Sequence, residues 1–116
     1  AMPRVKRGTQ HTKRRHNILK NAKGFKWGRK SKLKLAKVAV IKAGAHGRRD
    51  RRTKKRTARA LWSQKINAAA RLHGLSYSRL INALTKKQVI VDRKILAQIA
   101  EHNPAIFAEI VKKVTA

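Results

Sequence analysis

Residues 48–59 read RRDRRTKKRTAR, and no other segment limits the possible folds of this chain so strongly. Eight of the twelve residues are Lys or Arg, Asp50 is acidic, and Leu, Ile, Val and Phe are absent. A helix of this composition has no apolar stripe to pack on protein, and in free solution its charges repel one another. Yet the segment runs without Pro or Gly into a well-patterned helix at residues 58–73. We therefore expect a helix that is ordered by a negatively charged partner.

Positive charge is concentrated in the first half of the chain. The formal net charge is +28; residues 1–60 hold 23 Lys and Arg with one acid, whereas residues 61–116 hold nine with three acids. Charge of this size favours a polyanion, most commonly nucleic acid, because a solvated protein surface would mix both signs. The sequence predicts two domains, a basic extension at residues 1–59 and a globular helical domain at residues 60–116.

Enzymatic, metal-dependent and membrane functions find little support in the composition. The absence of cysteine excludes disulfides and thiolate metal sites. The chain has only four acids and no visible carboxylate pair for acid–base catalysis. No two of its five histidines are i,i+4 neighbours with a carboxylate partner, so we expect no metal, no cofactor and no small-molecule substrate. No apolar run approaches the roughly 18 residues of a membrane span, and the most basic segment lacks the apolar face of a membrane-active helix.

The N-terminal residues predict an extended arm and a short helix. Residues 1–8 should lack regular structure until they are bound. Thr9 is a suitable N-cap for a helix at residues 10–23, and Gly24 suits the left-handed position after that helix ends. Its few apolar residues, Ile18, Leu19 and Ala22, form a thin stripe.

Two aromatic residues, Phe25 and Trp27, lie among the cations Lys26, Arg29 and Lys30. This interleaving suits stacking on nucleic-acid bases. Packing on a neighbouring helix is an equal alternative, because aromatic residues make up only 4% of the chain and two of the five lie in this extension.

A second helical pattern starts near Ser31. Gly44 and Gly47 indicate a break after Ala43. Each glycine costs a helix only about 1 kcal/mol, so a long helix held by a partner could continue through both. The apolar residues of this pattern are Leu33, Ala36, Val40 and Ala43.

The C-terminal part predicts a small bundle of short amphipathic helices. Gly74 ends the helix at residues 58–73, Ser76 caps the next helix, and residues 86–88 form a turn. Asp92 caps a third helix, and Asn103 with Pro104 starts a fourth. The residues expected to form the core are Ala58, Leu61, Trp62, Ile66, Ala69, Leu72, Tyr77, Leu80, Ile81, Leu84, Ile95, Leu96, Ile99, Phe107, Ile110, Val111 and Val114.

A polar patch is expected beside the turn at Gly74. Asn67 and Arg71 are i,i+4 neighbours on one helix face, and Ser78 and Arg79 follow at the start of the next helix. We favour contact with RNA sugar and phosphate over a merely solvated face, because the charge of the whole chain points to nucleic acid.

Several separated motifs occur together in this chain. They are Met2-Pro3-Arg4-Val5-Lys6-Arg7-Gly8, Ala22-Lys23-Gly24-Phe25, Arg49-Asp50-Arg51-Arg52, Leu61-Trp62, Ile66-Asn67-Ala68-Ala69, Arg71, His73-Gly74-Leu75-Ser76-Tyr77-Ser78, and Asp92-Arg93-Lys94 with Leu96-Ala97. With these motifs in this order, the chain resembles, over nearly its whole length, the bacterial-type family of large-subunit ribosomal protein twenty, which also occurs in organelles.

The resemblance implies an all-α fold, with a long basic helical extension that penetrates 23S rRNA and a small C-terminal helical bundle. It implies a structural constituent of the large subunit, an early assembly protein whose neighbour is large-subunit protein twenty-one. In some bacteria the C-terminal domain of this family also represses its own messenger RNA. The implied location is the cytoplasm, in the ribosome, in preference to an organelle. The family pattern runs one helix from near Lys26 to His73, roughly 72 Å long, and we prefer it to the break after Ala43.

This chain departs from the family at three positions. The family often has aromatics at the positions of His46 and Arg48, and usually has Gly at the position of Gln88.

The residues predicted to bind RNA are Arg4, Lys6, Arg7, Lys13, Arg14, Arg15, His16, Lys20, Lys23, Phe25, Lys26, Trp27, Arg29, Lys30, Arg48, Arg49, Arg51, Arg52, Lys54, Lys55, Arg56, Arg59, Asn67, Arg71, Ser76, Ser78 and Arg79.

The main alternative is a DNA-binding architectural or helix-turn-helix protein. The helices at residues 58–73 and 77–86 are joined by a turn that contains Gly74, which mimics that motif. The basic extension is, however, far larger than a groove-reading tail needs, so RNA is the favoured partner.

Overall fold

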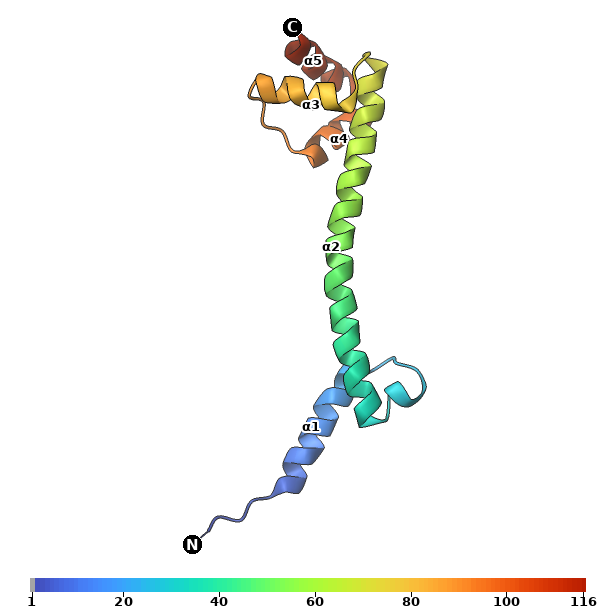
Figure 1. The fold of residues 1–116 in the computed structure, drawn as a ribbon, viewed down its shortest axis with the longest axis vertical. Coiled ribbons are helices and arrows are strands. Elements are labelled where there is room, and N and C mark those ends of the chain that lie inside the picture. The colour runs from blue at the N-terminus through green and yellow to red at the C-terminus, as the bar shows by residue number, and fades with distance from the viewer. Residues whose placement is uncertain (1) are drawn as a thin grey trace. The chain divides into compact units, whose positions relative to one another are not determined.

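A computed structural model describes residues 2–116, and in this range it contains helices and no strands. The elements are α1 (Arg7–Asn21), the 3-10 helix η1 (Trp27–Arg29), α2 (Leu33–Leu72), α3 (Tyr77–Lys86), α4 (Arg93–His102) and α5 (Pro104–Thr115) (Figure 1). The predicted all-α class is confirmed. The chain forms two compact units, which meet in sequence between Arg51 and Arg52 and are described separately.

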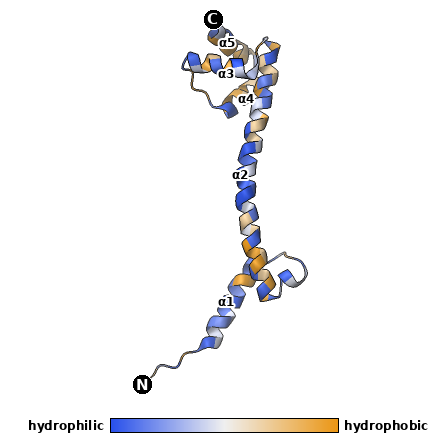
Figure 2. Ribbon diagram, in the orientation of Figure 1, coloured by the Kyte–Doolittle hydropathy of each residue, from blue (hydrophilic) through white to orange (hydrophobic). Residues whose placement is uncertain are grey.

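Helix α2 is continuous for 40 residues, through both Gly44 and Gly47. The break after Ala43 was therefore wrong, and the long helix implied by the family resemblance is confirmed. Each glycine weakens a helix by only about 1 kcal/mol, which is too little to require a break. Figure 2 shows that the middle of α2 is strongly hydrophilic, as the composition of residues 48–59 requires.

The beginning of α2 differs from the expectation that it starts near Lys26. Trp27 has a positive φ of 54°, and η1 and a turn precede Leu33. A helix cannot pass through a left-handed residue, because its hydrogen-bond ladder is broken there. The Lys32 N–H donates to the Gly28 carbonyl at 2.9 Å and so closes the turn just before the helix.

The first unit contains α1, η1 and the first part of α2. Helix α1 begins at Arg7, so Thr9 lies inside it and is not its N-cap. The helix ends at Asn21, two residues earlier than predicted, and Gly24 has the expected left-handed φ of 86°. Ala22 is fully buried, as is Ala36 of α2. This unit thus has a small apolar contact region, in keeping with its thin apolar stripes.

The second unit is a bundle of α3, α4, α5 and the last part of α2. Its buried core is made of Ile66, Ala70, Leu80, Leu84, Leu96, Ala97, Phe107, Val111 and Val114. Trp62, Tyr77, Ile81, Ile99 and Ile110 pack against that core as partly buried residues. Most of the residues predicted to form the core are confirmed.

Three residues expected in the core are exposed, and a fourth, Ala58, is half-buried but does not pack against the core. Leu61 is 49% exposed, Leu72 is 85% exposed and Ile95 is 46% exposed. In α2 the buried face follows Ile66 and Ala70, one turn apart, so Leu72 lies on a different face. Ala70 and Ala97 are buried, although the apolar pattern did not place them in the predicted core.

Ser76, Asp92 and Asn103 occupy the predicted N-cap positions of α3, α4 and α5. None of the three side chains makes a capping hydrogen bond. Pro104 stands in the first turn of α5, where its missing N–H has no cost. The sequence thus predicted correctly where the helices begin, but not which groups accept hydrogen bonds from their first backbone N–H groups.

Candidate nucleic-acid interface

The predicted RNA-binding residues of the first 51 positions lie along several segments. Arg4 and Lys6 precede α1, which carries six of the other cationic or histidine residues, and the remainder lie in the connection to α2 or on α2 itself. All of these side chains are exposed except that of Phe25, which is half-buried. The structure therefore presents these cations to solvent, where phosphate could reach them.

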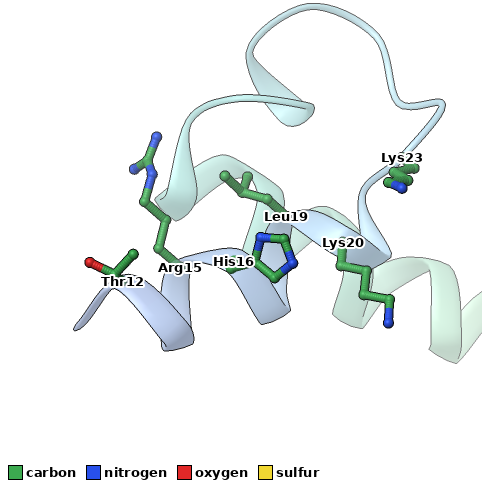
Figure 3. Close-up of a pocket in the computed structure, with 6 residues that line it drawn as sticks. All are labelled: Thr12, Arg15, His16, Leu19, Lys20 and Lys23. Atoms are coloured by element: carbon green, nitrogen blue, oxygen red, sulfur yellow. The ribbon is translucent and has the colours of Figure 1, made fainter. Parts of the chain in front are cut away.

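A hollow of about 460 Å³ follows α1 and its C-terminal end, where Figure 3 shows the lining side chains. Its cationic members include Arg15, Lys20 and Lys23. Arg15 is held in place, because its Nη2 donates to the backbone carbonyl of Ser31 at 3.2 Å. This bond joins α1 to the turn before α2. Arg15, Lys20 and Lys23 line one concave surface, which suits a phosphate.

The cations of residues 48–59 form a broad band on α2. At 3.6 residues per turn, the eight Lys and Arg positions spread over about 220° of the helix circumference. Asp50, Thr53 and Thr57 occupy the remaining side. The Arg49 Nε donates to Asp50 Oδ1 at 2.9 Å, and both side chains are mostly exposed. A band this wide can contact phosphates from more than one RNA strand at once, while the remaining side, about 140° of the circumference, carries no cations.

The polar patch predicted beside Gly74 is present in the second unit. Asn67 Oδ1 accepts hydrogen bonds from the Tyr77 backbone N–H at 3.1 Å and from Arg71 Nε at 3.4 Å. The hydroxyl oxygens of Ser76 and Ser78 are 3.2 Å apart. Arg71, Ser76 and Arg79 line an open hollow of about 440 Å³ together with Gly74 and Leu75.

The position of Asn67 changes its interpretation. It is half-buried, and its carbonyl oxygen accepts bonds from two donors of this chain. One of those donors is a backbone N–H in the first turn of α3, so Asn67 replaces the cap that Ser76 does not provide. Asn67 also orients Arg71 through the Nε bond, while Arg71 and Arg79 are the groups exposed to a ligand.

The two aromatic residues of the extension differ in how far they are exposed. Trp27 is 81% exposed, so it does not pack on the neighbouring helix, whereas Phe25 is partly covered. Both line a groove that also includes Lys42 and His46 of α2. The sequence analysis did not assign a role to these two α2 residues, because they are more than ten positions from Trp27 and only the fold brings them to it.

A second group that the sequence analysis missed surrounds the only tyrosine of the chain. Arg93 Nε donates to the Tyr77 hydroxyl oxygen at 2.8 Å, and Ser63 Oγ lies 3.4 Å from the same oxygen. Partial burial raises the pKa of Tyr77, but the bonds to Ser63 and Arg93 and the positive charge of Arg93 outweigh it, so the pKa is lowered overall. The motif Asp92-Arg93-Lys94 was the available signal for Arg93, though it did not indicate this contact.

Two structural features are absent from residues 2–116. No three His, Asp or Glu side chains in this range are grouped so that they could hold a metal ion. None of the helices in the described part of the chain is long and apolar enough to cross a membrane.

Comparison with known proteins identifies the family. The family model "Ribosomal protein L20" matches residues 4–110. The chain is 51% identical over 115 residues to the large ribosomal subunit protein bL20 of Psychrobacter cryohalolentis, covering 99% of this chain and 98% of that protein. It is 50% identical over 115 residues to the bL20 protein of Methylibium petroleiphilum, with the same coverage, and 54% identical over 113 residues to that of Methylorubrum populi, covering 97% and 93%. With a family match over most of its length and relatives about half identical from end to end, this chain belongs to the ribosomal protein L20 family.

Proposed function

We propose that this chain binds 23S rRNA directly and supports an early stage of large-subunit assembly, as a structural and non-enzymatic protein of that subunit. The observation that carries the proposal is the cationic band of residues 48–59. Every side chain from 48 to 57 is exposed, and none is a large apolar residue, so protein packing cannot be the purpose of this part of α2. Membership of a ribosomal family supports rRNA as the polyanion that this band would bind.

The proposed mechanism of the extension, residues 1–59, is charge neutralisation coupled to ordering. Lys and Arg displace the counterions condensed on the RNA backbone, and the release of these counterions to bulk solvent favours binding. RNA helices that repel one another can then approach the same stretch of α2 from different sides, because the cations cover more than half of its circumference. The extension would thereby stabilise an RNA fold that forms early in assembly.

The proposed role of the second unit is recognition of a particular RNA shape. Arg71 and Arg79 border one hollow, and Asn67 holds the Arg71 guanidinium by its Nε. A fixed guanidinium loses less conformational entropy on binding and leaves its two terminal nitrogens for a phosphate or a base edge. This geometry favours a defined RNA site over uniform contact with any phosphate chain.

Three further assignments follow from the family resemblance alone and belong to the same proposal. They are a position beside large-subunit protein twenty-one, a location in cytoplasmic ribosomes, and repression of the protein's own messenger RNA. The last would use the second unit, whose patch would bind a messenger segment that imitates the rRNA site.

The test is a salt titration of binding to a large-subunit rRNA fragment, beside a DNA duplex and an unrelated RNA. Each phosphate contact adds roughly 0.7–0.9 to the slope of log affinity against log salt. We expect all three slopes to be large, and the rRNA fragment to keep an advantage at high salt. Coincident curves would contradict specific rRNA recognition and favour an architectural DNA-binding protein.

A further inference from the structure

A groove of about 660 Å³ lies in the first unit, between the connection after α1 and the first turns of α2. Its apolar lining comes from both sides, with Phe25 and Trp27 on the connection and Leu35 and Val38 on α2. Leu35 is 50% exposed and Val38 is 51% exposed. A highly charged chain thus leaves aromatic and aliphatic surface facing one open space.

The backbone of Trp27 is strained. Its φ of 54° lies in the left-handed region, which a bulky side chain rarely adopts and glycine adopts easily. Burial of the indole does not offset the energetic cost of this strain, since the residue is 81% exposed. Backbone strain that is not offset by packing within the folded chain commonly marks a binding position.

The turn that carries Trp27 is fixed at several points. The Lys30 N–H donates to the Trp27 carbonyl at 3.3 Å, and the Lys32 N–H donates to the Gly28 carbonyl at 2.9 Å. Gly28 lies so close to α2 that a Cβ built on it would be 3.1 Å from Leu35 Cδ1. The indole therefore projects from a turn of defined position beside α2.

Three cations and one histidine line the same groove. Lys26 and Arg29 belong to the connection, while Lys42 and His46 extend from α2. In the part of the chain that the structure describes, all four acids lie outside this lining. An apolar protein segment would gain nothing from this ring of cations, whereas a nucleotide has a flat apolar base and an anionic phosphate to satisfy both features.

We propose that this groove holds an unpaired RNA base, which stacks on the indole of Trp27 while its flanking phosphates are neutralised by Lys26, Arg29 and Lys42. The proposal rests on the proposed RNA-binding function and deepens it, because it predicts single-stranded or bulged RNA at this point. A paired base is inaccessible to the indole, since both of its faces are already stacked. The aliphatic face of Leu35 and Val38 would cover the part of the base that Trp27 leaves open.

The test uses full-length protein in which Trp62→Phe leaves Trp27 as the only tryptophan. Two probes with the same number of phosphates are compared, a short oligoadenylate and an oligomer of base-free sugar phosphates. We expect oligoadenylate to quench Trp27 fluorescence and to bind more tightly, whereas the base-free oligomer should cause little quenching. Equal quenching and equal affinity for both probes would overturn the proposal.

Variants at Trp27 provide the matched controls. Trp27→Gly removes the indole and relieves the positive φ, so its thermal stability should equal or exceed that of the parent. It should lose roughly 5- to 100-fold in affinity for oligoadenylate, the effect of one lost base–aromatic stack, and keep its affinity for the base-free oligomer. Trp27→Phe should retain most of the affinity. Unchanged oligoadenylate binding in Trp27→Gly would refute the base site.

The two proposals fail differently. If only the base site is wrong, Trp27→Gly binds every probe like the parent, and the rRNA fragment still exceeds DNA at high salt. If rRNA recognition itself is wrong, that advantage is absent in the parent protein as well.

Discussion

Arg93 Nε donates a hydrogen bond to the hydroxyl oxygen of Tyr77 at 2.8 Å, and this contact joins the first residue of α4 to the first residue of α3. Ser63 of α2 lies 3.4 Å from the same oxygen. One hydroxyl group thus connects three helices of the second unit. Because the unit is small and its core has few large side chains, such a connection should contribute measurably to its stability.

Tyr77→Phe should therefore destabilise the second unit. The change keeps the ring and removes the oxygen, so we expect a loss of about 0.5–1.5 kcal/mol in the free energy of unfolding. Urea denaturation of the full chain, followed by circular dichroism, measures it. In a double-mutant cycle with Arg93→Met, the effects should be less than additive. Additive effects would mean that the contact has no energetic weight.

The same contacts predict an unusual titration of Tyr77. Its pKa lies below the ordinary 10.0: burial raises it, but the bonds to Ser63 and Arg93 and the charge of Arg93 more than compensate. A lowered pKa in the folded state means that this group adds stability as the pH rises through the interval between the folded pKa and 10.0, and that the gain is absent below that interval.

Absorbance of the phenolate follows this titration without ambiguity, because the chain has one tyrosine. The midpoint should lie below 10.0 in the folded protein and move toward it in urea. Arg93→Met should raise the midpoint of the folded protein, while Lys113→Met, a basic residue on α5, is the control. A midpoint that is insensitive to Arg93 would show that this guanidinium does not act on the phenol.

Arg71 tests the distinction between recognition and charge. Arg71→Ala should weaken binding to the specific rRNA fragment by roughly 5- to 100-fold and affect random duplex much less. Lys6→Ala should weaken both to a similar extent and reduce the salt slope by about one. Equal losses on both ligands in Arg71→Ala would remove the case for a recognition patch.

Asn67 gives a related prediction that only the structure provides. Asn67→Ala removes the acceptor for Arg71 Nε and for the Tyr77 backbone N–H. Part of its effect on RNA binding should therefore disappear when Arg71 is already alanine, whereas the stability loss from the α3 terminus should remain. Full additivity in RNA binding would instead assign Asn67 a direct contact of its own.

Local patterns predicted the elements of this fold well and their details less well. The N-cap positions Ser76, Asp92 and Asn103 could be predicted, because the preference for these residue types at a helix start depends only on their immediate neighbours in sequence. The cap on α3 could not be found this way, because Asn67 supplies it from ten residues away. The exposure of Leu72 likewise depends on which face the other helices cover, and no local pattern contains that information.

The candidate interface shows the same division. Its cations were evident from composition, and the patch at Arg71 followed from helical spacing. The groove at Trp27 was not predicted, because it requires a left-handed tryptophan and side chains from the later helix. The continuity of α2 through Gly44 came from the family resemblance, since the local signal of two glycines favoured a break.

The middle of α2 should be ordered by RNA, and this can be measured directly. Residues 48–57 are exposed throughout, so little buried surface opposes the repulsion among their cations. In the free protein at low salt we expect their amides to exchange rapidly with deuterium, while amides of the second unit's core are protected. Binding of the rRNA fragment should slow exchange across these residues, because phosphates remove the repulsion. Strong protection of residues 48–57 in the free protein would show that the helix is stable on its own and that RNA binds a preformed rod.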